Sequence, residues 1–257
     1  MRFCLLASGS KGNCVWIGAA GGGGSVLIDN GLSCSEFLKR ATLAGLPLGG
    51  LRDIVVSHEH SDHIGGVGPL ARKLGLTVHM TKIAAVSHAT RLGPVRLRTF
   101  EPGDTLGMGD ISLSTMTGSH DAADPVAFVA RRGGKSLGLA TDLGVVTQLI
   151  RRNLEGLDAL ILEFNHDLGM LLGGPYPFFL KQRVRGRLGH LSNDEAAEAL
   201  RSLNHPGLRE LVLAHLSETN NDPGLARRAA ESALAGHGHR PNLTVASQAR
   251  PTAILGI

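Results

Sequence analysis

The residues with the clearest chemical potential lie in one short segment, residues 57–63, which reads Ser-His-Glu-His-Ser-Asp-His. His58 and His60 are two positions apart after a β-branched run, so we expect both side chains to point the same way at the end of a strand. Asp62 and His63 follow on a predicted turn into a helix, where neighbouring side chains diverge toward a second centre. Imidazole and carboxylate groups together suit Zn²⁺, Mn²⁺ or Fe²⁺. The segment therefore predicts a metal site rather than a solvated histidine-rich loop.

Three further candidate ligands lie at the polar ends of apolar runs that we predict to be strands: His120, Asp142 and His215. A single histidine in such a place is more often a surface or hydrogen-bonded residue. Three in succession, after the segment at 57–63, favour one shared site. A structural zinc site is usually closed by four ligands, so a set this large indicates a catalytic centre with two ions.

The order of these ligands resembles that of a known family. H-x-H-x-D-H, followed by a His, an Asp and a last His, is the ligand series of the metallo-β-lactamase superfamily. Further motifs are similar to those of the YycJ/WalJ group of bacterial metallohydrolases and cover most of the chain, at residues 7–13, 27–29, 118–122, 141–144, 165–167, 174–177, 189–193 and 213–217. That group is regarded as nucleolytic, with 5′-to-3′ exonuclease activity on double-stranded DNA, and the motifs also resemble those of tRNase Z.

The resemblance implies a role for each ligand. The candidates form two sets that share a carboxylate: His58, His60 and His120 for one ion, Asp62, His63 and His215 for the other, and Asp142 for both. The two divalent ions are expected to be zinc or manganese, with iron as the alternative, and a hydroxide between them would be the nucleophile. Catalytic roles are implied for Asp62 and for His190, which matches the leaving-group acid of tRNase Z.

Two polar segments are candidates for substrate binding. The first is a glycine-containing turn between two predicted strands, where phosphate could meet Ser8, Ser10, Lys11 and Asn13, although an ordinary turn fits equally well. The second follows the aromatic stretch at 176–179 and carries a basic residue at every second position: Lys181, Arg183, Arg185 and Arg187.

Basic side chains beside aromatic ones suit a nucleic-acid backbone and a splayed base, and we select Arg183 and Arg185 as the binding candidates. The alternative is a solvated helix face, since a helix would spread these charges around its axis. His166 is a further candidate for the same pocket and a second candidate for the general acid.

The elements that must position these residues alternate between strands and helices. We predict strands at 3–7, 14–17, 26–28, 53–57, 77–80, 95–100, 111–116, 126–131, 136–140, 159–164, 210–214 and 243–246. We predict turns at 21–24 and 133–134, and helices at 33–44, 64–74, 145–152, 194–203 and 224–235. Strands in blocks with intruding helices indicate an α/β fold with four layers, α/β/β/α, in one domain over residues 1–257.

Composition limits the class of protein. The chain has 257 residues, 42% of them hydrophobic, and no apolar run of membrane-spanning length, so we expect no membrane association. Its start is too short and polar for a signal peptide, and its 3 cysteines form no CxxC pair, which favours the reducing cytoplasm. The formal net charge is +4, and most of the basic residues are arginine, which is compatible with an anionic partner. Two alternatives to a DNA nuclease stay open: a small-molecule or RNA hydrolase on the same metal core, and a non-catalytic DNA-binding protein.

Overall fold

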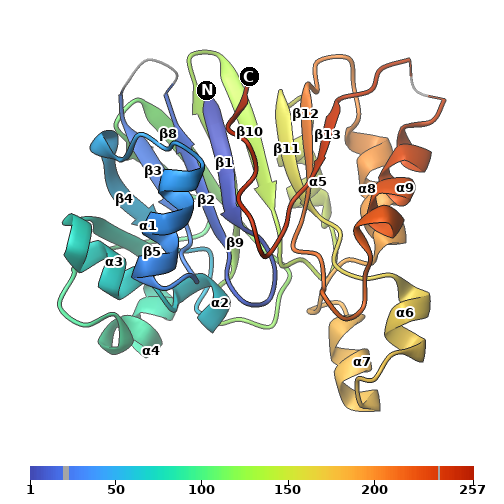
Figure 1. Cartoon of the computed structure of the whole chain (residues 1–257), viewed down its shortest axis with the longest axis horizontal. Coiled ribbons are helices and arrows are strands. Elements are labelled where there is room, and N and C mark those ends of the chain that lie inside the picture. The colour runs from blue at the N-terminus through green and yellow to red at the C-terminus, as the bar shows by residue number, and fades with distance from the viewer. Residues whose placement is uncertain (20–22, 237) are drawn as a thin grey trace.

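The computed structural model describes residues 1–19, 23–236 and 238–257, and its strands form two mixed sheets (Figure 1). The first sheet has the order β14 (Leu255–Gly256), β1 (Arg2–Ala7), β2 (Cys14–Gly18), β3 (Ser25–Ile28), β4 (Leu51–Val55), β5 (Thr77–Thr81), β6 (Arg96–Phe100). The second has the order β13 (Asn242–Val245), β12 (Glu210–Ala214), β11 (Ala159–Glu163), β10 (Lys135–Ala140), β9 (Val126–Arg132), β8 (Ile111–Thr117), β7 (Thr105–Met108).

Helices cover the outer faces of the two sheets (Figure 1). The first sheet packs against α1 (Cys34–Leu43), α3 (Val67–Leu74) and α4 (Lys82–Leu92), with the short α2 (Ser61–Ile64) and the 3₁₀ turn η1 (Leu48–Gly50) nearby. The second packs against α5 (Gln148–Leu154), α8 (Asn193–Leu203) and α9 (Pro223–Leu234). Two more helices, α6 (Leu168–Gly173) and α7 (Phe178–Val184), project from the lower right of the sandwich.

The alternation of side chains along each strand separates three apolar cores. In β1, Phe3 and Leu5 pack into the layer between the sheets, while Cys4 and Leu6 face the helices on the outside. Strands with both faces buried read as continuous apolar runs, as the sequence of β12 does. The predicted four-layer α/β/β/α fold is confirmed.

Most predicted elements occur within a few residues of the expected bounds, with informative exceptions. The helix predicted at 64–74 begins later, as α3 at Val67, because the chain turns at Gly65 and Gly66 after the short helix α2, which was not predicted. A side chain at Gly66 would meet the carbonyl oxygen of Leu32 at 1.7 Å, so this turn is pressed against the neighbouring loop. The sequence reading missed β7, β14, α4, α6 and α7.

The predicted turn at 133–134 joins β9 to β10 as a two-residue hairpin loop, and both glycines have positive φ. Residues 21 and 22 of the predicted turn at 21–24 lie outside the described residues. Among the helices in the described ranges, none combines the length and apolar character needed to cross a bilayer.

Candidate metal centre and active site

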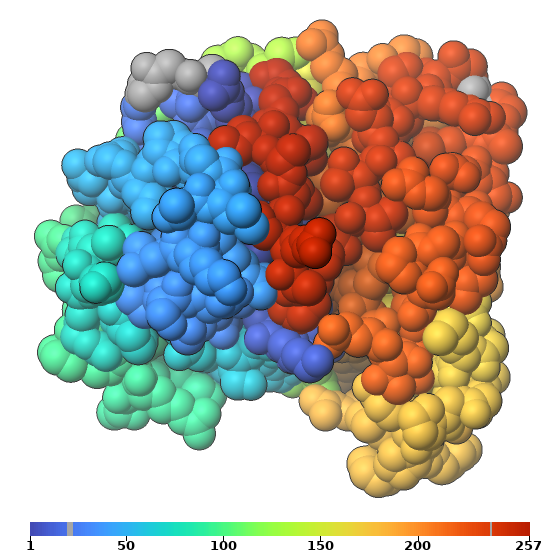
Figure 2. Space-filling model, viewed as in Figure 1, coloured from blue at the N-terminus to red at the C-terminus, as the bar shows by residue number. Residues whose placement is uncertain are grey.

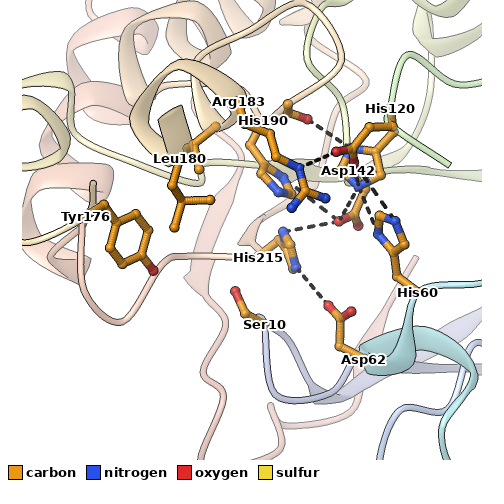
Figure 3. Close-up of a pocket in the computed structure, with 13 residues that line it drawn as sticks. Ser10, His60, Asp62, His120, Asp142, Tyr176, Leu180, Arg183, His190 and His215 are labelled. Carbon is orange, nitrogen blue, oxygen red and sulfur yellow. Dashed lines mark hydrogen bonds and ion pairs between the residues drawn. The ribbon is translucent and has the colours of Figure 1, made fainter. Parts of the chain in front are cut away.

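The candidate ligands converge at one edge of the sandwich, where several strands end (Figure 3). Asp29 follows β3, Asp142 follows β10 and His215 follows β12. These are the non-glycine residues with positive φ in the described part of the chain, with φ values of 59°, 57° and 55°. A left-handed backbone is unfavourable for such residues and is concentrated at functional sites, where the surrounding structure enforces it. The strained backbone therefore marks the same place as the sequence motifs.

One set of ligands consists of His58, His60 and His120. Their candidate ligand nitrogens lie within 4.8 Å of one another. The ring centroids of His58 and His60 are 4.7 Å apart, and those of His60 and His120 are 5.0 Å apart. The expected strand alternation does not account for this pairing, because β4 ends at Val55 and the two histidines lie in the following loop. The loop conformation brings the rings together instead.

The other set consists of Asp62, His63 and His215, whose candidate ligand atoms also lie within 4.8 Å of one another. The Oδ2 atom of Asp62 is 3.4 Å from Nε2 of His63 and 3.7 Å from Nε2 of His215. Asp62 and His63 belong to α2 rather than to the turn before a helix. Gly31 packs directly against this helix, and a side chain there would meet the carbonyl oxygen of Asp62 at 1.9 Å. The close approach fixes α2 relative to the sheet.

Asp142 lies between the two sets. Its Oδ2 atom is 3.4 Å from Nε2 of His63, and its Oδ1 atom is 3.9 Å from Nε2 of His120. Oδ1 also lies 3.5 Å from Nδ1 of His215, so the carboxylate is close to residues of both sets. This geometry fits a bridging ligand.

Each of three rings is held by a hydrogen bond from its second nitrogen. Nδ1 of His63 lies 2.8 Å from Oδ2 of Asp29, and Nδ1 of His58 lies 2.9 Å from Oγ of Ser57, which itself donates to Asp29. Nδ1 of His120 lies 3.0 Å from the carbonyl oxygen of Gly189. Such partners fix the orientation of a metal-binding imidazole and leave Nε2 as the ligand atom.

Glu163, at the end of β11, is a central residue of the site that the sequence reading missed. Its side chain is fully buried and accepts hydrogen bonds from Nδ1 of His190 at 2.8 Å and from Nδ1 of His215 at 3.0 Å. It also accepts from three backbone N–H groups, those of Asp142, Leu143 and Leu191. Burial raises the pKa of Glu163, but His190 and His215 outweigh it and lower the pKa to about 2. The ionised carboxylate can only accept, so both histidines must donate from Nδ1.

The same positional rule that selected His120, Asp142 and His215 would have found Glu163. It is the charged last residue of an otherwise apolar strand, Ala-Leu-Ile-Leu-Glu.

The residues present fit a pair of metal ions. Nε2 of His58, Oδ2 of Asp142 and Nε2 of His215 are buried and have no hydrogen-bond partner among the described residues. A buried polar atom without a partner costs free energy, and each of these three residues belongs to a group of candidate ligands whose atoms lie within 4.8 Å of one another. Neutral imidazole nitrogen and carboxylate oxygen are the donors that zinc and manganese accept.

Electrostatics divide the histidines into two kinds. Burial, together with the neighbouring His63, lowers the pKa of His58 well below its usual value. Burial alone would also lower the pKa of His63 and His215, but Asp142 and the other nearby carboxylates outweigh it. The pKa of His63 is raised well above its usual value, and that of His215 is raised to about 10. A metal ion must therefore displace protons from His63 and His215.

The centre opens into a cavity of about 300 Å³, whose lining includes His60, Asp62, His120, Asp142, His190 and His215 (Figure 3). Ser10 and Arg183 also line it, as do Tyr176 and Leu180 from the segment around α7. The structure thus brings two of the predicted substrate-binding residues to the cavity.

The other predicted substrate-binding residues do not line this cavity. Ser8 is buried and its Oγ accepts from the backbone N–H of His215 at 2.7 Å. The amide nitrogen of Asn13 lies 3.2 Å from Oδ2 of Asp62 and 3.0 Å from Nε2 of His63, so this side chain contacts ligands. Lys11 is paired with Glu218 at 2.6 Å.

Arg185 is exposed and bonds to Gln182, outside the cavity lining. His166 is completely buried, and neither of its ring nitrogens has a partner among the described residues. Because His190 lines the cavity and His166 does not, the geometry favours His190 as the general acid.

Comparison with known proteins gives the family. Residues 25–216 match the family model described as a beta-lactamase superfamily domain. The chain is 35% identical over 237 residues to the exodeoxyribonuclease YycJ of Bacillus anthracis, which covers 91% of this chain and 89% of that protein. It is 35% identical over 239 residues to the exodeoxyribonuclease WalJ of Streptococcus pneumoniae serotype 2, strain D39, which covers 91% of this chain and 88% of that protein.

Among solved structures, Zn²⁺-bound PqqB from Methylobacterium extorquens has a TM-score of 0.76 at 16% identity and covers 100% of both chains. This likeness shows the fold. The chain belongs to the metallo-β-lactamase superfamily, and the predicted resemblance to the YycJ/WalJ group is confirmed. The protein is a metal-dependent hydrolase of that superfamily.

Proposed function

We propose that this protein is a dinuclear exonuclease that removes nucleotides from the 5′ ends of double-stranded DNA. The observation that carries the proposal is the carboxylate of Asp142, which lies between the two sets of candidate ligands in the lining of a single cavity. The substrate class is taken from the relatives named as exodeoxyribonucleases at 35% identity. The free thiols of Cys4, Cys14 and Cys34 suit a protein that works in the reducing cytoplasm.

The two sets would hold one ion each, with Asp142 shared. When bound, the ions activate water and neutralise charge that develops on the phosphoryl oxygens. The protein's own groups do the remaining work. His190 lines the cavity with one-fifth of its side chain exposed, and its Nδ1 donates to Glu163. When the ring carries a proton on both nitrogens, Nε2 is the nitrogen that can give its proton to the leaving oxygen, and the ring is left neutral with its proton on Nδ1.

Arg183 contributes a permanent positive charge at the cavity, where its guanidinium pairs with Asp121 at 2.5 Å. A phosphate entering the cavity would compete with Asp121 for this group, because Arg binds phosphate through parallel N–H donors. The cavity thus combines an acidic, histidine-rich base with a cationic side group, as a phosphodiester substrate requires.

The test compares three variants on 5′-labelled duplex DNA with Mn²⁺, with bound metal measured in each. Asp142→Ala should lose both ions and nearly all nucleotide release. His190→Ala should keep its metal and lose a factor of about 10² to 10⁴ in rate. His88→Ala changes a histidine of α4 that lies outside the cavity and serves as the matched control. A metal-loaded wild-type protein that releases no nucleotide refutes the proposal, and equal metal loss in the first two variants refutes the separation of their roles.

A further inference from the structure

The segment between β11 and α8 forms an arm, residues 168–188, that contains α6 and α7 and projects from the sandwich (Figures 1 and 2). The arm has no acidic residue and carries Lys181, Arg183, Arg185 and Arg187. It also holds five of the nine large hydrophobic residues that are exposed in the described parts of the chain: Leu168, Leu172, Phe178, Phe179 and Leu188. Exposed apolar side chains gathered beside polar or charged ones often mark a surface that binds another molecule.

The two sides of α7 face different surroundings. Leu180, Arg183 and Val184 line the cavity, together with Tyr176 just before the helix (Figure 3). Phe178 and Phe179 do not line it, and they are 75% and 72% exposed. They are the exposed phenylalanines of the described chain. The helix therefore forms one wall of the active-site cavity and carries two exposed aromatic rings outside that cavity.

The arm is fixed to the loop that carries His120. The backbone N–H of Asp121 donates to the carbonyl of Leu188 at 2.9 Å, and Oγ of Ser119 donates to the carbonyl of Arg187 at 2.7 Å. Within the arm, Nζ of Lys181 donates to the carbonyl of Leu172 at 2.7 Å and so joins α7 to α6. These contacts hold the wall at a set position beside the metal centre.

The metal centre lies deep in a cavity that is small compared with a base-paired DNA end. The candidate ligands at its base are buried, with His63, His215 and Asp142 exposed by 0%, 2% and 5%, and the cavity holds only about 300 Å³. Enzymes that act on a base bring the nucleotide out of the duplex to reach such a pocket, and a phosphodiester that must reach these buried residues meets a comparable obstacle. Separation of the two strands at the duplex end would remove this obstacle.

We propose that the arm separates the strands at a duplex end, with the cut strand passing on the cavity side of α7 and unpaired bases of the other strand stacking on Phe178 and Phe179. Aromatic faces accept bases of any sequence, and the arm's arginines match the charge of the phosphates. This inference rests on the proposed nuclease function and specifies how a double-stranded substrate is used.

The experiment measures two rates with metal-loaded protein: release of the 5′ nucleotide from a blunt duplex and from the same strand unpaired. Replacing both rings, Phe178→Ala with Phe179→Ala, should lower the ratio of duplex rate to single-strand rate about tenfold, equivalent to about 1.4 kcal/mol. The matched control, Ile83→Ala with Val86→Ala, removes two exposed side chains of α4 and should leave the ratio unchanged. An unchanged ratio in the phenylalanine variant, or an equal fall in both of its rates, overturns the inference.

A second readout does not need activity. With chelator-treated protein, the fluorescence of a 2-aminopurine at the duplex end should increase on binding, because the base leaves the stack. The increase should be smaller with the phenylalanine variant. If wild-type protein brightens the probe but releases no nucleotide, the proposed function fails and the strand separation stands. If it releases nucleotides without brightening the probe, only the strand separation fails. The phenylalanine variant could instead lose binding to anionic vesicles or self-association while the rate ratio stays unchanged. That result would show that the rings contact a membrane or a second copy of the protein, and it would overturn the inference.

Discussion

The most informative single substitution is Glu163→Gln, which keeps the shape of the side chain and removes its charge. Oε1 of Glu163 accepts from Nδ1 of His190, Nδ1 of His215 and the backbone N–H of Asp142. Oε2 accepts from the backbone N–H groups of Leu143 and Leu191. Glutamine has one acceptor oxygen and one NH₂ donor, so one of these two positions must present a donor.

The two orientations of the amide have different costs. If the NH₂ group replaces Oε2, it faces two backbone donors and two charge-assisted bonds are lost, at about 1.5–3 kcal/mol each. If it replaces Oε1, only the bond from Asp142 is lost outright, because the two hydrogens of the NH₂ group can be donated to His190 and His215 once each of these rings has its proton on Nε2. We expect the second orientation, with a loss of about 2 kcal/mol in the free energy of unfolding. The proton on Nε2 of His215 then blocks that nitrogen as a ligand.

The assay combines urea unfolding of the metal-free protein with the metal content of the loaded protein. Glu163→Gln should lower the unfolding midpoint and lose the ion expected on Asp62, His63 and His215. Glu210→Gln is the matched control, since Glu210 is also buried but bonds to Asn242 away from the site. If Glu163→Gln keeps the full metal content, a proton on Nε2 of His215 does not block metal binding, and the prediction is wrong even if the protein is destabilised.

Three further predictions follow from the ligand shell. Metal binding should release protons from His63 and His215, because in the metal-free protein the pKa of His63 is raised well above its usual value and that of His215 is raised to about 10. Metal affinity should therefore rise with pH from 7 toward about 10, and calorimetry in buffers of different ionisation enthalpy will show the proton release. Asp29→Asn should weaken metal affinity about 10- to 100-fold in a chelator competition, since Asp29 holds the ring of His63. Gly31→Ala should destabilise the protein by about 1–3 kcal/mol in urea unfolding, because the new methyl group meets the carbonyl of Asp62 at 1.9 Å.

Each of these has a control or an opposing result. Heats of binding that do not depend on the buffer would contradict proton release. Asp53→Asn changes a comparable carboxylate–histidine contact, to His79 at 2.8 Å, outside the metal centre. An equal loss of metal affinity in that variant would contradict a specific role for Asp29. Gly49→Ala places a methyl group where nothing lies within 4 Å, so an equal effect would show that loss of glycine alone is responsible.

The fold was largely predictable because the cores depend on apolar runs. Runs such as those of β11 and β12 are apolar over nearly their whole length and bounded by polar residues, which is typical of buried strands. The missed elements lack that signal. α6 and α7 are short, and the exposed Phe178 and Phe179 break the expected helical pattern of apolar residues. Their position depends on contacts with the loop at 118–122, which no local pattern encodes.

The candidate ligands could be selected in the sequence by their residue types, but their surroundings could not be predicted. Imidazole and carboxylate groups at strand ends are visible in the sequence. The pairing of Asp29 with His63, or of Ser8 with the backbone of His215, joins segments far apart in the chain, and its outcome depends on the register of the sheets. For the same reason Asn13, expected to meet substrate, instead contacts the ligands Asp62 and His63.

The arrangement explains how a stable sandwich carries an unfavourable site. Three left-handed residues and several unpartnered buried polar atoms are gathered at one edge of the sheets, and each of these features opposes folding. The three apolar cores lie elsewhere, between and outside the sheets, so they stabilise the fold without relaxing that edge. The carboxylates of Asp29 and Glu163 at this edge orient the rings of His63 and His215 for a metal ion. Binding of metal supplies partners to the unpartnered atoms, and it should stabilise the folded state by mass action as well as supply the chemistry.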